Sequence, residues 1–166
     1  HHAKRAACRN IAVVASPPSD RNLRKSAVAR GLRQRHHHRR PAIAATVNGV
    51  RIVNLYVVNG QDIGTEKYDY KLRWLDAVHG WLADELKRHP QLVVMGDFNI
   101  APDDRDVHDP AVWNDDSILT STAERAALKR LLDLGLHDAY RLHHHEGGFF
   151  SWWDYRQAGF RRNLGL

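Results

Sequence analysis

The residues best suited to chemistry are Asp97 and Asn99, in the stretch VVMGDFNIAP. An apolar run of strand length precedes Asp97, so we expect its carboxylate at the C-terminal end of a buried strand, where layered α/β folds bind ligands. A carboxylate beside an amide can orient a water molecule for attack on phosphorus, and both groups offer oxygen ligands to a hard divalent cation. The competing interpretation is a structural turn of Gly96 and Asp97 that Asp97 caps through its own backbone.

Two further clusters bear on metal binding. Asp103, Asp104 and Asp106 follow in a polar loop expected over 103–120, and they favour the functional interpretation of Asp97 because they add oxygen ligands nearby. The histidines at 143–145 lack partners at the spacing of metal ligands. We therefore expect them in a solvated loop rather than in a metal site.

The aromatic C-terminal segment, SWWDYRQAGFRRNLGL, is a candidate nucleic-acid surface. If the segment is extended, Trp152 and Trp153 point to opposite faces, so one can fill the core while the other meets a ligand. An exposed aromatic ring beside Arg156, Arg161 and Arg162 suits DNA, where rings stack or wedge and guanidinium groups hold phosphates.

The elements that must position these residues are indicated by hydrophobic periodicity. Asn48-Gly49 predicts an antiparallel hairpin, and Tyr56 lies near the end of its second strand, where it is either a second catalytic candidate or a packing residue. We expect strands at 42–47, 50–58 and 92–97. A first helix is expected over 66–89, with an apolar stripe of Leu72, Leu75, Val78, Leu82 and Leu86. A second helix should begin at the capping box of Ser121 and Glu124 and end at Gly135.

Length and composition favour one domain without a membrane span. The chain has 166 residues, and no apolar run approaches the roughly 18 residues that cross a bilayer. The single cysteine, Cys8, excludes an internal disulfide, so a cytoplasmic location is the simpler expectation.

The net charge of +6 belongs to the first quarter of the chain alone. Residues 1–41 hold 11 of the 25 basic residues and one of the 19 acidic residues, which leaves 14 basic and 18 acidic residues in 42–166. The composition of 1–41 favours disorder. Three interpretations stay open for it: a basic arm for nucleic acid, plain disorder or vector-derived sequence, and translation of a GC-rich gene in a wrong frame.

The chain resembles the exodeoxyribonuclease III family of abasic-site endonucleases from about Ile43 to Leu166. The resemblance lies in the order and spacing of four segments: NLYVVNGQDIGTEKYDYKLRWLDAV, LVVMGDFNIAPDDRDVHDPAVW, ERAALKRLLDLGLHDAYR and FSWWDYRQAGFRRNLGL. GDFN is shared across the endonuclease/exonuclease/phosphatase superfamily, whereas SWWDYR with GF and NLGL is typical of its DNA-repair branch.

The resemblance implies a role for each candidate residue. Asp97 orients or deprotonates the attacking water, Asn99 fixes water and phosphate beside it, and Tyr56 lies against the scissile phosphate. Mg²⁺ is the implied cofactor, with Mn²⁺ as a substitute, and Asp97 and Asn99 are its implied ligands. The implied DNA-binding residues are Trp152, Trp153, Arg156 and Phe160.

The implied activity is Mg²⁺-dependent hydrolysis of DNA phosphodiesters at abasic sites and from 3′ ends, on double-stranded DNA and with no obligate protein partner. The alternatives are a non-catalytic nucleic-acid-binding remnant and a phosphatase of the same superfamily. The aromatic, Arg-rich tail favours DNA over the phosphatase substrates.

The implied fold is α/β, a four-layer sandwich of two packed mixed sheets flanked by helices. We expect residues 42–166 to form part of it, without the family's first and last strands. The family's metal-binding glutamate lies upstream of the hairpin, but this sequence has no glutamate before Glu66, and the family's Asp-His pair follows beyond NLGL. We therefore expect exposed sheet edges, marginal stability and a tendency to associate, and the activity of this chain is left open.

Overall fold

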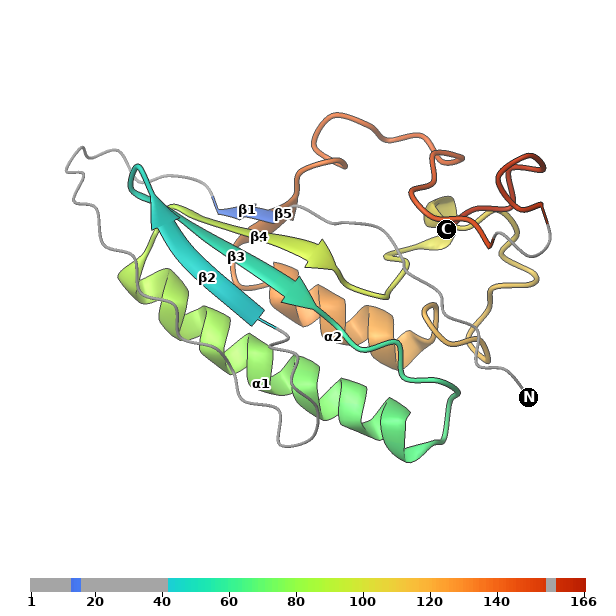
Figure 1. Cartoon of the computed structure of the whole chain (residues 1–166), viewed down its shortest axis with the longest axis horizontal. Helices are drawn as coiled ribbons and strands as arrows, with labels where there is room; N and C mark the ends of the chain where they lie inside the picture. Colours follow the sequence, from blue (N-terminus) through green and yellow to red (C-terminus); the bar gives the residue numbers. More distant parts are fainter. Residues whose placement is uncertain (1–12, 16–41, 155–157) are drawn as a thin grey trace.

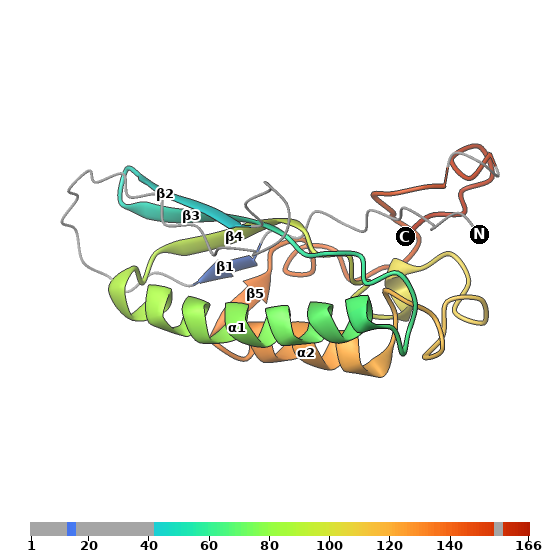
Figure 2. The ribbon, with the colours of Figure 1, turned by 60° about the horizontal axis from the view of Figure 1, so that its bottom comes forward.

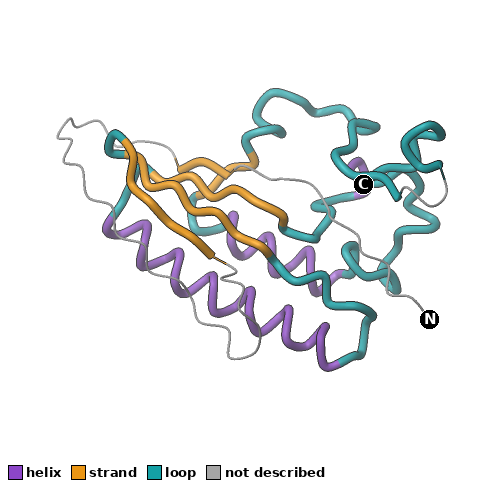
Figure 3. Tube along the Cα trace, viewed as in Figure 1, coloured by secondary structure: helices purple, strands orange, loops and turns teal. Residues whose placement is uncertain are grey.

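The centre of the molecule is a five-stranded mixed sheet in the order β2-β3-β4-β1-β5 (Figure 1). The structure is a computed structural model that describes residues 13–15, of which only the backbone is described, 42–154 and 158–166. Figure 3 separates the strands and helices from the long loops that follow them. The strands are β1 (Val13–Ala15), β2 (Ala42–Val47), β3 (Val50–Tyr56), β4 (Leu92–Asp97) and β5 (Leu136–Asp138).

The hairpin of β2 and β3 is confirmed. Its strands pair antiparallel from Ala42 opposite Leu55 to Val47 opposite Val50. Asn48 and Gly49 both have positive φ, 49° and 85°, which is the backbone that a two-residue hairpin turn of the favoured twist requires. β3 then runs parallel to β4, so both strands end at the same edge of the sheet.

Helices α1 (Glu66–Arg88) and α2 (Thr122–Leu132) lie on the same face of the sheet (Figure 2). Thr65 caps the start of α1, and its hydroxyl accepts a hydrogen bond from the Tyr68 N–H. The capping box of Ser121 and Glu124 is present at the start of α2, as predicted. A short 3-10 helix, η1 (Asp104–Asp106), lies in the loop between β4 and α2.

The stripe that α1 buries differs from the prediction at its two ends. Leu75, Val78 and Leu82 are buried as expected, but the next core-facing positions are held by Lys71 and Glu85 rather than by the neighbouring leucines. The reason is geometric, because Lys71 and Glu85 each lie seven residues, close to two helical turns, from Val78 in the centre of the stripe, whereas Leu72 and Leu86 lie to its side and are half-buried. Both are buried and both form ion pairs.

The opposite face of the sheet carries exposed apolar side chains. Side chains alternate along the strands, so Ala44, Val53 and Leu55 face the helices and are buried, while Ile43 and Met95 project from the other face. The α/β class and the mixed sheet are confirmed. A four-layer sandwich stays a prediction, because the described residues form one sheet and one layer of helices.

Strand β1 corrects the sequence analysis, which favours disorder throughout residues 1–41. Val13–Ala15 pairs antiparallel with β4 on one side and with β5 on the other. The run IAVVA is rich in β-branched residues, but it is too short to stand out from its Arg- and His-rich surroundings. The interpretations of the rest of 1–41 concern residues outside those described. Within the described ranges, no helix has the length and apolar character needed to span a membrane.

Candidate active site at the carboxyl edge of the sheet

Tyr56 and Asp97 are brought together at the sheet edge where β3 and β4 end. They are direct partners in the parallel register and are the last residues of their strands. Partners in adjacent strands project from the same face of a sheet. This face is the one opposite the helices, and Tyr56 is 47% exposed there. The side chains of Tyr56 and Asp97 thus leave the sheet from adjacent positions on one face.

Asn99 is tied to both strand ends. Its backbone N–H donates to Asp97 Oδ1 at 3.0 Å, and its side-chain Nδ2 donates to the Val57 carbonyl at 2.8 Å. Its φ of 48° lies in the left-handed region, which asparagine tolerates better than most residues. The turn of the structural interpretation is therefore present. It also orients the Asp97 carboxylate, so the structural and catalytic interpretations are compatible.

Gly96 is required by the close approach of β3 and β4. Its φ is 128°, which L-residues rarely adopt. A Cβ atom built on Gly96 would lie 2.0 Å from the Leu55 carbonyl oxygen and 2.7 Å from Asn54 Oδ1. The glycine of GDFN thus sets the strand spacing that places Asp97 beside Tyr56.

Among the described residues, Asp97 and Asn99 offer a carboxylate and an amide oxygen at the end of β4. Asn99 is completely buried, and its Oδ1 has no hydrogen-bond partner among the residues that the structure describes. A buried acceptor without a partner is rare in proteins and is a candidate ligand position. Mg²⁺ is often held by one or two carboxylates together with substrate phosphates, so Asp97 and Asn99 fit as part of such a site. In the described ranges, no three His, Cys, Asp or Glu residues gather in metal-binding geometry.

The acids of the following loop are engaged by arginines. Asp104 pairs with Arg125 at 2.8 Å, and Asp106 pairs with Arg141 at 2.6 Å. Burial raises the pKa of Asp103, but the hydrogen bonds from Arg105 outweigh it and hold the pKa of this carboxyl below its ordinary value. These acids stabilise the loop, and they do not strengthen the metal-site interpretation of Asp97.

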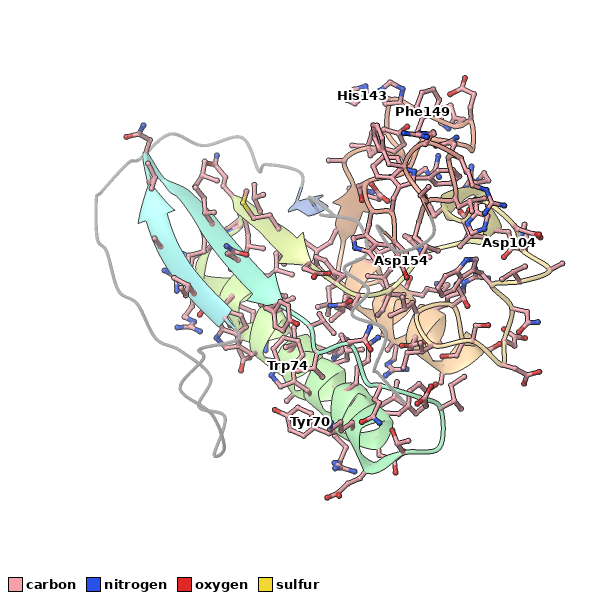
Figure 4. All side chains as sticks on the ribbon, turned by 45° about the vertical axis from the view of Figure 1, so that its right-hand side comes forward. Tyr70, Trp74, Asp104, His143, Phe149 and Asp154 are labelled. Carbon is pink, nitrogen blue, oxygen red and sulfur yellow. The ribbon has the colours of Figure 1, made fainter. Side chains whose placement is uncertain are left out.

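Two arginines fix the loop that contains the three histidines. Arg141 donates to the carbonyls of His144 and Glu146, and Arg105 donates to the carbonyl of His145. The histidines are exposed, and Figure 4 shows His143 and Phe149 at the outer edge of the molecule. The three histidines therefore lie in an exposed loop, as expected.

Arg141→Met is expected to lower the free energy of unfolding by about 3 kcal/mol, because it removes one partner of a largely buried ion pair with Asp106. Arg105→Met is the matched control, since its ion pair with Asp103 is half exposed and should contribute much less to stability. Urea unfolding of both variants measures the difference. Equal losses would mean that burial of the Arg141 pair is not what matters.

The aromatic segment divides between core and surface. Trp152 packs against a small cluster of Ala101, Val107, Leu119 and Leu166. Trp153 stacks edge-on with Phe160, at 5.0 Å between ring centroids, and Phe160 is 75% exposed. Trp152 and Trp153 thus have different neighbours, buried residues for the first and an exposed ring for the second. Arg156 lies outside the described residues.

The sequence analysis did not single out Lys71 as part of the site. Its Nζ contacts the backbone of Asn99 and the carboxylate of Glu124, which the sequence indicated only as a helix cap. The sequence does contain one indication of its position, because Lys71 lies four residues before Leu75 and therefore on the buried stripe of the helix.

The chain belongs to the endonuclease/exonuclease/phosphatase family, because the sequence model of that family matches residues 16–166. Among curated relatives, the exodeoxyribonuclease of Bacillus subtilis is 29% identical over 133 residues, 80% of this chain and 52% of the relative. Exodeoxyribonuclease III of Haemophilus influenzae is 32% identical over 122 residues, 69% of this chain and 46% of the relative. The chain therefore spans about half the length of these relatives.

Solved structures agree with this assignment. The 3′-5′ exonuclease NExo from Neisseria meningitidis superposes with a TM-score of 0.79 at 44% identity, over 86% of this chain and 55% of that one. A Neisseria NExo structure described as a 3′ phosphatase bound to a product DNA hairpin gives 0.75 at 48% identity, over 78% and 50% of the two chains. An AP endonuclease from Archaeoglobus fulgidus superposes with a TM-score of 0.76 at 27% identity, over 95% of this chain and 63% of that one.

Proposed function

We propose that this chain carries the catalytic edge of a DNA-repair nuclease of the exodeoxyribonuclease III type. The observation that carries the proposal is the pairing of Tyr56 with Asp97 at the ends of β3 and β4, with Asn99 bonded to the Asp97 carboxylate. The names of the relatives, which are exodeoxyribonucleases and an AP endonuclease, support it. The proposal includes the family's four-layer sandwich, of which the described residues would be one sheet and its helices.

The proposed reaction is hydrolysis of a DNA phosphodiester on the 5′ side of an abasic site or at a 3′ end. Asp97 accepts a proton from water as the water oxygen forms its bond to phosphorus. The bond from phosphorus to the 3′ oxygen breaks, and that oxygen keeps the electron pair, takes a proton from solvent water and leaves as a hydroxyl. Tyr56 donates a hydrogen bond to the phosphate as negative charge develops there. Asn99 keeps the carboxylate oriented through its backbone N–H.

The proposed cofactor is Mg²⁺, with Asp97 and Asn99 Oδ1 as two of its oxygen ligands and Mn²⁺ as a substitute. When bound, a divalent cation supplies Lewis-acid stabilisation of the phosphoryl oxygens. A hard cation with oxygen ligands suits the two donors at this edge, because no thiolate and no imidazole is among them. Further ligands would include the DNA phosphate itself.

The proposed DNA surface is the edge formed by Trp153, Phe160 and the exposed Arg161 and Arg162. Rings stack on bases or enter between them, and guanidinium groups hold phosphates. The partner is double-stranded DNA, including DNA with an abasic site. Trp152 packs against buried residues, and Arg156 lies outside the described residues, so the proposed surface is argued from the other four residues.

Phe160→Ala is expected to weaken DNA binding about tenfold, within the roughly 1–3 kcal/mol that one stacking contact contributes. The folding stability should hardly change, because the ring is mostly exposed. Fluorescence anisotropy with a labelled duplex measures the affinity. Phe149→Ala is the control, since this exposed aromatic lies on another loop and should leave the affinity unchanged. Equal losses would remove Phe160 from the proposed DNA surface.

A second candidate is removal of a 3′ phosphate from DNA, which the description of the DNA-bound Neisseria structure favours. The two reactions share the attack of water on phosphorus and differ in the leaving group. A carboxyl-edge site that holds one phosphate serves both, and the substrate preference depends on the surrounding surface.

The test is a substrate panel with the wild-type chain, in Mg²⁺ and in EDTA. It contains a duplex with a synthetic abasic site, a duplex with a 3′-phosphate end and an intact duplex. Nicking of the abasic duplex in Mg²⁺ alone supports the nuclease, whereas release of phosphate alone supports the second candidate. Salt-dependent DNA binding without either reaction would support the non-catalytic remnant and contradict the proposal.

A further inference from the structure

Lys71 is a completely buried lysine beneath the proposed site. Burial of an ammonium group is costly unless charged and polar partners replace its water. Its Nζ donates to the Asn99 carbonyl at 2.7 Å and to the Asn59 carbonyl at 3.2 Å, and it forms an ion pair with Glu124. These acceptors belong to the loop after β4, the loop after β3 and the first turn of α2.

Hydrogen bonds at the starts of both helices extend the Lys71 cluster, which also contains Glu124, Ser121 and Tyr68. Glu124 Oε2 accepts hydrogen bonds from the Ser121 hydroxyl at 2.6 Å and from its backbone N–H at 3.3 Å. The Ser121 hydroxyl lies 2.7 Å from the Tyr68 hydroxyl, which leads back to α1. Lys71 thus joins the start of each helix to the two loops that follow the strands of the site.

Asn99 is the residue at which this cluster meets the proposed site. Lys71 holds its carbonyl, Asp97 accepts from its backbone N–H, and the Val57 carbonyl accepts from its side chain. Its backbone has a positive φ, so outside contacts are needed to hold it. Loss of the Lys71 contact would remove one of the three hydrogen bonds that hold Asn99.

We propose that Lys71 is a positioning residue for the proposed site. Its ammonium fixes the backbone of Asn99, and through Asn99 the orientation of the Asp97 carboxylate. The inference rests on the proposed function for its effect on catalysis. Its structural part, the fixing of Asn99, is independent of that function.

A second buried ion pair provides a matched control. Arg51 donates to Glu85 at 2.7 Å, with both side chains at most 5% exposed. This pair also joins α1 to β3, but Arg51 is in register with Leu92 at the start of β4, the end of the strands opposite to Tyr56 and Asp97. Removal of either pair should affect packing between α1 and the sheet, whereas only the Lys71 pair reaches Asn99.

The experiment compares two double variants, Lys71→Met with Glu124→Gln and Arg51→Met with Glu85→Gln. Each removes both charges, so no buried ion is left alone. On the substrate that the wild-type chain cleaves, the Lys71 variant should lower kcat at least about tenfold with KM changed less than about threefold, the pattern of a misplaced catalytic group. The Arg51 variant should keep kcat within about twofold. Equal losses of kcat would overturn the inference.

Amide hydrogen exchange of Asn99 by NMR is the second readout. The Asn99 backbone N–H should exchange at least about tenfold faster in the Lys71 variant and at the wild-type rate in the Arg51 variant. If the wild-type chain cleaves no DNA, the proposed function fails, and the exchange rates alone decide: equal rates in both variants overturn the positioning role. If the Lys71 variant does not fold, Lys71→Leu with Glu124→Leu carries the same comparison, because apolar replacement of a buried pair is often tolerated.

Discussion

Asp97→Asn should reduce the rate of DNA cleavage at least about 100-fold, the lower end of the contribution of a positioned general base and a larger loss if Asp97 also binds the metal. Asparagine keeps an oxygen at the position that accepts from the Asn99 N–H, so the turn that follows β4 should stay intact. Cleavage of the preferred substrate under single-turnover conditions is the measurement.

Two controls separate chemistry from folding in this experiment. The free energy of unfolding of Asp97→Asn should stay within about 1 kcal/mol of wild type, because the lost charge lies at a partly exposed edge. Asp104→Asn removes a carboxylate from a surface ion pair in the next loop and should keep the wild-type rate. A rate for Asp97→Asn within about threefold of wild type would remove Asp97 from the mechanism.

Gly96→Ala should cost about 4 kcal/mol or more of folding stability, among the largest effects of a single methyl group. Two causes act together. The positive φ is strained for any residue with a Cβ, and that Cβ would overlap the Leu55 carbonyl oxygen of the adjacent strand. β3 and β4 would have to separate at the point where Tyr56 and Asp97 lie side by side, so activity should fall with stability.

Gly64→Ala is the matched control for this strain. Gly64 also has a positive φ, 79°, but a Cβ there meets nothing within 4 Å. Its cost should be about 1–2 kcal/mol, that of the backbone conformation alone. Equilibrium unfolding in urea or guanidinium compares the two variants. A Gly96→Ala protein no less stable than Gly64→Ala would show that the strands relax around the new methyl group.

The sequence was a good guide to the elements with strong local signals. The Asn48-Gly49 turn, the capping box of Ser121 and Glu124 and the strand before Asp97 were all predictable, because each depends on neighbours in the chain. The sequence placed Tyr56 and Asp97 each near the end of a strand. Their direct pairing depends on β3 and β4 being parallel neighbours, which the local sequence does not specify.

Features that depend on distant residues could not be predicted. β1 is set by backbone pairing with strands that lie far along the chain. Lys71 was not predicted in the core, since a lysine is buried only when partners such as Asn99 and Glu124 converge on it from other segments. The arginine partners of Asp104 and Asp106 lie 21 and 35 residues away, so the loop acids looked more available for metal binding than they are.

The most direct test of the central claim follows the water oxygen in the reaction. The wild-type chain is incubated with the abasic-site duplex and Mg²⁺ in ¹⁸O-labelled water, and the products are analysed by mass spectrometry. Attack of water on phosphorus at the Asp97 edge predicts one ¹⁸O atom in the 5′ phosphate of each cleaved strand and an unlabelled 3′ hydroxyl. Cleavage without label in that phosphate, or no cleavage of either the abasic-site or the 3′-phosphate duplex, would contradict the account.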